Sequence, residues 1–163
     1  MTDARSTASL VLAKAAVVAG LAGAMQLVLL TSIVVVGKVG FGLEGLPPIE
    51  YVGTVGLLIV ATVPLAVLQS TLSMLLRSFA APVAISLVAA GISVGALMVI
   101  GTPAVLLPHA LVARTTQLGT GTFADDGNAG IAEIASIGGA AIVVAAVITA
   151  VSVAVLDRRD AKV

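Results

Sequence analysis

The sequence predicts an all-α integral membrane protein with about four transmembrane helices. Hydrophobic residues make up 60% of the chain and charged residues 10%, whereas a soluble domain has about 25% charged residues. The mean hydropathy is +1.22. Because long runs without charge occupy most of the 163 residues, apolar surface must face lipid. The whole chain, 1–163, is therefore expected to form a single transmembrane domain.

Four apolar runs are long enough to cross a bilayer. A span needs about 20 apolar residues, because the hydrocarbon core is about 30 Å thick and a helix rises about 1.5 Å per residue. Each run must be helical, since lipid offers no hydrogen-bond partner to open backbone groups. The first run is too long for the core of a cleaved signal peptide, which has about 7 to 15 residues. The predicted spans are about 15–36, 51–76, 81–107 and 134–156.

The stretch between Arg77 and Arg114 carries no charge and is too long for one helix at modest tilt. Pro103 and Pro108 are the expected break, because proline lacks a backbone donor and clashes within a helix. A Gly- and Thr-rich loop is expected over 119–122, followed by a polar turn over 125–128. Part of this loop could be a short re-entrant or interfacial helix.

Basic residues predict the orientation, because Lys and Arg in short loops stay preferentially in the cytoplasm. Six of the eight fall on one side of the predicted spans, and only Lys38 and Arg114 fall on the other. Both termini are therefore predicted to be cytoplasmic. The six are Arg5, Lys14, Arg77, Arg158, Arg159 and Lys162.

Composition argues against several classes of function. The formal net charge of +0 argues against a nucleic-acid partner, which requires a surplus of basic residues. The chain has no cysteine and one histidine, His109, so thiolate sites and paired-histidine zinc sites are excluded. Gly37-Lys38 is followed by Val39, which does not make a phosphate-binding loop. We expect no catalytic residue, cofactor or metal, and His109 is expected to be an ordinary polar loop residue.

A few residues within the spans are candidates for helix packing or for a substrate path. Gln26 and Gln69 carry side-chain amides, which in lipid usually bond across helices. Packing is favoured over pathway lining for both. Gly91 and Gly95 form a small-xxx-small pair on one helix face, which predicts a close helix contact.

The segment 68–85 (Leu-Gln-Ser-Thr-Leu-Ser-Met-Leu-Leu-Arg-Ser-Phe-Ala-Ala-Pro-Val-Ala-Ile) resembles ABC-2 type transporter permeases of the lantibiotic-immunity and bacitracin-resistance kind. In that family a Leu-Gln-rich helix end meets a Leu-Arg-Ser-Phe-Ala turn, and the next helix begins almost at once. The opening, with Arg5 and then Leu12-Ala13-Lys14 before a long apolar run, is similar to the family's third span. The resemblance covers nearly the whole chain, as the last four of the family's six spans.

The resemblance implies a multi-pass subunit of the bacterial cytoplasmic (inner) membrane, powered by a separate ATP-binding cassette ATPase and paired with a second permease copy. The expected function is export of a peptide or lipid-like substrate. Arg77 is expected in a cytoplasmic turn, either as a simple anchor or as part of a functional turn. The family's two N-terminal helices and its main coupling loop are missing from this sequence, which suggests a truncated or split permease.

Two other functions remain open. A non-transporting four-helix scaffold or accessory subunit is favoured by the scarcity of polar residues within the spans. An ion-coupled transporter would need an ionisable residue within a span, and the nearest candidate is Glu133.

Overall fold

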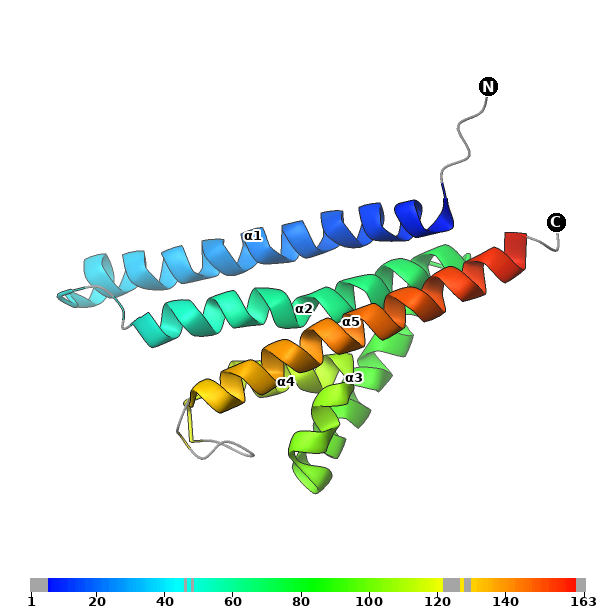
Figure 1. Cartoon of the computed structure of the whole chain (residues 1–163). Coiled ribbons are helices and arrows are strands. Elements are labelled where there is room, and N and C mark those ends of the chain that lie inside the picture. The colour runs from blue at the N-terminus through cyan, green and yellow to red at the C-terminus, as the bar shows by residue number, and fades with distance from the viewer. Residues whose placement is uncertain (1–5, 46, 48, 122–126, 128–129, 161–163) are drawn as a thin grey trace.

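The computed structural model describes residues 6–45, 47, 49–121, 127 and 130–160. Throughout these residues the chain forms helices and connecting turns, with no strand (Figure 1). This confirms the predicted all-α class. The helices are α1 (Thr7–Phe41), α2 (Ile49–Leu75), α3 (Ala80–Ile100), the 3-10 helix η1 (Thr102–Leu106), α4 (Pro108–Gln117) and α5 (Ile131–Asp160).

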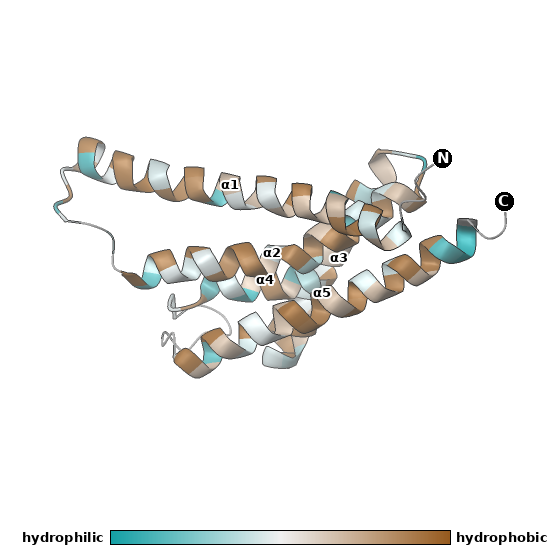
Figure 2. Cartoon of the chain, turned by 45° about the horizontal axis from the view of Figure 1, so that its top comes forward, coloured by the Kyte–Doolittle hydropathy of each residue, from teal (hydrophilic) through white to brown (hydrophobic). Residues whose placement is uncertain are grey.

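Four of the helices, α1, α2, α3 and α5, are long and apolar enough to cross a membrane. The shortest, α3, has 21 residues, and at about 1.5 Å per residue it matches a hydrocarbon core of about 30 Å. Hydrophobic residues cover these helices along most of their length, and hydrophilic residues concentrate toward their ends (Figure 2). The prediction of a helical membrane protein with four spans is confirmed.

Helix α1 is longer than its predicted span of 15–36. It begins at Thr7 because Ser6 caps it, with the Ser6 hydroxyl oxygen accepting a hydrogen bond from the Ser9 backbone N–H at 3.2 Å. It ends at Phe41 because Gly42 adopts a left-handed conformation, with φ of 65°. The Leu43 N–H then bonds to the Gly37 carbonyl at 3.0 Å. Local capping therefore sets both ends of α1.

Helix α3 ends at Ile100, before the predicted end of its span at residue 107. Gly101 has φ of 66° and ψ of −137°, a conformation open essentially to glycine alone. Pro103 and Pro108 lie in the first turns of η1 and α4, where proline is tolerated because no intrahelical donor is lost. The expected break is present, and α4 realises the short helix that the sequence left open.

Helix α2 lies at the centre and packs against α1, α4 and α5. One core cluster joins α2, α4 and α5 through Leu57, Leu111 and Ile137, and a second joins α1 and α2 through Val11, Ala15 and Val67. At Gly23, a Cβ would be in van der Waals contact with the Ile59 side chain of α2, at 3.4 Å. Helix α3 diverges from α2 (Figure 1) and packs mainly against η1 and α4.

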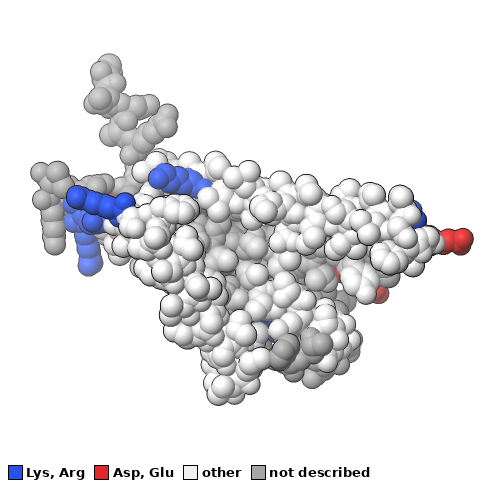
Figure 3. Space-filling model, turned by 180° about the vertical axis from the view of Figure 1, so that it is seen from behind, with Lys and Arg blue, Asp and Glu red and all other residues white. Residues whose placement is uncertain are grey.

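The start of α1 and the end of α5 lie at the same end of the molecule (Figure 1). In the view of Figure 3, basic side chains gather at this end, acidic side chains gather at the other, and the surface between is almost uncharged. We call the first of these the basic end. The polar turn expected over 125–128 lies outside the described residues except for Gly127, as do Arg5 and Lys162.

Candidate functional site

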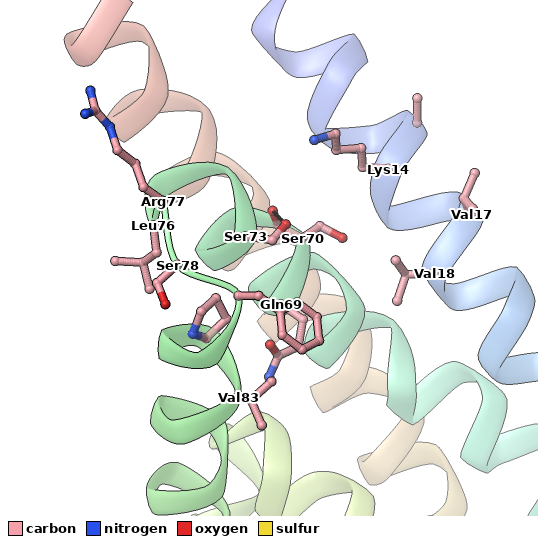
Figure 4. Close-up of a pocket in the computed structure, with 13 residues that line it drawn as sticks. Lys14, Val17, Val18, Gln69, Ser70, Ser73, Leu76, Arg77, Ser78 and Val83 are labelled. Carbon is pink, nitrogen blue, oxygen red and sulfur yellow. Dashed lines mark hydrogen bonds between the residues drawn. The ribbon is translucent and has the colours of Figure 1, made fainter.

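A groove of about 750 Å³ opens at the basic end, between α1, the end of α2 and the start of α3 (Figure 4). It exists because α1 and α3 both pack beside α2 but do not contact each other within the described residues. We call it the basic groove. The residues that line it are Ala13, Lys14, Val17, Val18, Gln69, Ser70, Ser73, Leu76, Arg77, Ser78, Phe79, Pro82 and Val83.

A turn of four residues, 76–79, separates α2 from α3 and carries Arg77 at the rim of the groove. Helix α5 holds this turn, because the Arg159 Nη1 donates a hydrogen bond to the Leu75 carbonyl at 2.8 Å. A cationic side chain on a terminal carbonyl also complements the negative end of the helix dipole. The tight α2–α3 connection is therefore fixed from a third helix.

Two basic side chains line the end of the groove nearest the helix termini, and an amide lies farther in. Lys14 lines the groove from α1, Gln69 from α2 and Arg77 from the turn between α2 and α3. Figure 4 shows Lys14 and Arg77 on opposite sides of Ser70 and Ser73. No carboxylate is among the described residues that line the groove, so its local charge is positive.

The Ser70 hydroxyl is buried without a hydrogen bond. Ser70 is 4% exposed, and its Oγ has no partner among the described residues. Its neighbours behave differently, since the Ser73 hydroxyl donates to the Ser70 carbonyl at 2.7 Å and Thr71 bonds to Ser152. A buried polar atom without a partner is uncommon and costs free energy. Ser70 is therefore the one described lining residue with a buried side-chain polar atom that lacks a hydrogen-bond partner.

The structure brings together two of the residues predicted from the sequence, Gln69 and Arg77, in the basic groove. Gln26 lies farther along α1, half-buried, and does not line the groove. Gly91 and Gly95 are exposed on α3, and a Cβ at either would meet no atom within 4 Å. No other helix in the described part of the chain packs on their face.

Lys14 was expected from the sequence as an orientation signal and as part of the segment that resembles the family's third span, and not as a residue of a site. A signal was present, because Lys14 interrupts an otherwise apolar stretch that precedes Val17 and Val18. Its position opposite Ser70 depends on how α1 crosses α2. That crossing depends on contacts between residues more than fifty positions apart, such as Val11, Ala15 and Val67.

A second polar site lies at the other end of α5, where Arg114 of α4 forms an ion pair with Glu133. The Arg114 side chain is 7% exposed and that of Glu133 is 26% exposed. Ala110, Leu111 and Thr115 are buried beside Arg114 on the same face of α4. This amphipathic spacing was visible in the sequence, but the pairing of Arg114 with Glu133 was not. The acid considered for ion coupling, Glu133, thus binds a buried arginine.

His109 lies at the start of α4, outside the four membrane-spanning helices. Partial burial removes water from the imidazole and lowers the pKa of His109 below its ordinary value of 6.5. The neutral form is therefore favoured near neutral pH. Among the described residues, no group of three or more His, Cys, Asp or Glu side chains could hold a metal ion.

Comparisons of this chain with protein-family models, with curated proteins and with solved structures find no match. The resemblance of segment 68–85 to ABC-2 type permeases is thus a hypothesis that depends on the motif residues alone.

Proposed function

We propose that this protein is the membrane-spanning subunit, or the C-terminal part of one, of an ABC-type exporter in the bacterial cytoplasmic membrane. A separate ATP-binding cassette ATPase would supply the energy, and the substrate would be a peptide or lipid-like molecule. The observation that carries the proposal is the α2–α3 turn. Segment 68–85, which resembles the permeases, supplies nine of the thirteen described residues that line the basic groove.

The turn has the features of a docking site for a cytoplasmic partner. Arg77, Ser78 and Phe79 are exposed, and Phe79 has 91% of its surface accessible. An exposed aromatic beside an arginine is a combination enriched at protein interfaces. The Arg159 bond to Leu75 fixes this turn relative to α5, so a force applied at the turn would be transmitted to α2, α3 and α5 together.

The proposal requires the basic end to face the cytoplasm. Lys14, Arg77, Arg158 and Arg159 lie near the helix termini at this end, in accord with the positive-inside rule. Because the chain has no cysteine, single cysteines can report topology. A cysteine replacing Ser78 should resist a membrane-impermeant maleimide in intact cells, and one replacing Glu44 should react. The reverse labelling would refute the orientation.

A second copy of the chain is proposed to pack on the face of α3 that carries Gly91 and Gly95. Small residues at this spacing let helices approach closely, and this face is free of other described side chains. Replacing both glycines by leucine should reduce disulfide crosslinking between copies that carry a cysteine at Ile92. Leucine at Gly20 and Gly53, which also have open surroundings, is the matched control and should leave the crosslinking unchanged.

Co-purification tests the exporter function directly. Tagged protein from native membranes should recover an ATPase whose activity rises in its presence. Replacing Arg77 and Phe79 by alanine should abolish this recovery, whereas alanine at Lys38 and Phe41, at the other end of α1, should not. Recovery of only non-ATPase membrane proteins would instead support the alternative, a non-transporting scaffold or accessory subunit. The low content of polar groups in the four spans favours that alternative.

A further inference from the structure

We propose that the basic groove binds one anionic phospholipid, with its phosphate beside Lys14 and Ser70 and an acyl chain between α1 and α3. This inference depends on the membrane location of the four helices and not on the exporter function. The groove's volume of about 750 Å³ lies in the range of about 300 to 1,000 Å³ that is common for small-molecule sites.

The groove is most polar near the helix ends and becomes more apolar toward the middle of the membrane. Lys14 is seven residues from the start of α1, and Gln69 is six residues from the end of α2. At about 1.5 Å per residue, both lie within about 10 Å of the helix ends, at headgroup depth. Val18 lies about one turn deeper in α1 than Lys14, and Figure 4 shows Val83 of α3 at the end of the groove away from Lys14 and Arg77. A phospholipid has the same order, with a polar headgroup at the membrane surface and apolar acyl chains below it.

The groove is complementary to an anion. Its described lining includes two basic side chains and no acidic one, and basic pockets between transmembrane helices at the cytoplasmic face attract acidic headgroups. The unpaired Ser70 hydroxyl gives an independent indication. Ser70 is 4% exposed, lacks a partner and lines the groove, and Figure 4 shows its side chain on the side of α2 that faces α1. A phosphate or glycerol oxygen would satisfy it.

A protein segment is a less suitable occupant. The groove opens between membrane helices at a position where lipid is the surrounding solvent, and most of the residues that line it away from its basic side chains are apolar. A lipid satisfies both conditions without insertion of backbone groups, which would need hydrogen-bond partners in the membrane. The α2–α3 turn at the rim remains accessible to a soluble partner when the groove is filled.

Fluorescence quenching by brominated lipids can test this proposal. The chain has no tryptophan, so Phe79→Trp places a single reporter at the groove. The purified full-length chain would be reconstituted in phosphatidylcholine vesicles that contain a minor fraction of brominated phosphatidylglycerol or, in parallel, brominated phosphatidylcholine. We expect stronger quenching by the phosphatidylglycerol. Lys14→Gln should weaken the apparent affinity by about fivefold, which corresponds to about 1 kcal/mol per basic residue.

Lys38→Gln is the matched control, because Lys38 lies on the same helix at the other end and should not alter quenching at position 79. Ser70→Ala separates a ligand contact from a structural role. Its hydroxyl has no partner in the protein, so the thermal midpoint in neutral detergent should be kept or raised, while the preference for phosphatidylglycerol falls. A lower midpoint with an unchanged preference would assign Ser70 to the fold and contradict the proposal.

Three further outcomes would overturn it. Equal quenching by the two brominated lipids would show that the groove does not select an anionic headgroup. Relief of quenching by millimolar inorganic phosphate would identify a site for free anions and not for lipid. If both brominated lipids quench the reporter in vesicles but neither quenches it in native membranes, a protein covers the groove. None of these measurements uses an ATPase, so failure here is independent of failure of the exporter proposal.

Discussion

The hydroxyl groups of Thr71 and Ser152 lie 2.8 Å apart and join α2 to α5 inside the membrane-spanning region. Ser152 donates its own proton to the Ile148 carbonyl at 2.6 Å. Thr71 has two acceptors at 2.8 Å, the Ser152 hydroxyl and the Val67 carbonyl of its own helix, and because a hydroxyl has one proton to donate, Thr71 shares that proton between them. Both residues are buried, with exposures of 6% and 3%, so lipid cannot replace this bond.

Removing the Thr71–Ser152 bond should destabilise the protein modestly. We expect Thr71→Val and Ser152→Ala each to lower the unfolding free energy by about 0.6 kcal/mol, and by no more than about 1.7 kcal/mol, the range for interhelical bonds in membranes. The double variant should cost less than the sum, because the two changes remove the same bond. Unfolding in mixed detergent micelles measures this. Thr31→Val is the control, since Thr31 is exposed on α1 and bonds to Leu27 of its own helix.

The Arg114–Glu133 pair should stabilise the docking of α4. Glu133→Gln removes the carboxylate that faces a buried guanidinium. We expect a loss of about 1–3 kcal/mol, below the 3–5 kcal/mol of fully buried pairs, because Glu133 is 26% exposed. Glu50→Gln, at an exposed position at the start of α2, should change the thermal midpoint little. If the two variants have equal midpoints, the ion pair does not stabilise the fold.

Gly101 should be intolerant of a side chain. Its φ of 66° and ψ of −137° are essentially restricted to glycine, so Gly101→Ala should cost about 1–3 kcal/mol. Gly91→Ala, in the middle of α3 with open surroundings, should be neutral or stabilising by up to about 1 kcal/mol. Thermal unfolding of the two variants side by side measures the contrast. Equal effects would show that Gly101 adopts another conformation.

His109 should make stability depend on pH. Burial lowers its pKa in the fold, so the unfolded chain binds the proton first as the pH falls. The stabilising contribution of neutral His109 is complete above the ordinary value of 6.5 and is lost as the pH falls from there through the folded pKa. The thermal midpoint of unfolding should therefore decrease as the pH is lowered below 6.5. His109→Gln should reduce this fall, and identical profiles for variant and wild type would exclude His109 as the cause.

The number of membrane helices could be predicted from the sequence because the criterion is local. Each span requires an uncharged run of sufficient length, and runs such as 15–36 satisfy it whatever surrounds them. The helix boundaries were harder, since α1 extends to Ser6 and Gly42 through capping. The end of α3 depended on the backbone conformation of Gly101, which composition does not specify. Pro103 and Pro108 indicated that the third helix would be interrupted, but not that it would end at Ile100.

The candidate site was only partly predictable. Gln69 and Arg77 were selected as polar residues near the end of a span, and both line the basic groove. Gly91 and Gly95 were expected at a helix contact, but α3 turns its other face, with Ser93 and Leu97, toward the rest of the chain. In a helix of alanine, valine and glycine, several faces are equally suitable for packing. The pattern therefore could not identify the buried face.

Three features of this protein follow from its sequence alone. Its long apolar segments are surrounded by lipid, its backbone is helical, and its basic residues are concentrated near one end. Lipid imposes these features through length, apolarity and charge position, which are properties of each segment taken separately. The convergence of Lys14, Ser70 and Arg77 on one groove, and the pairing of Arg114 with Glu133, depended on how the helices cross. Crossing is set by contacts between distant small and aliphatic side chains, such as Gly23 with Ile59, whose mutual fit exists only in three dimensions.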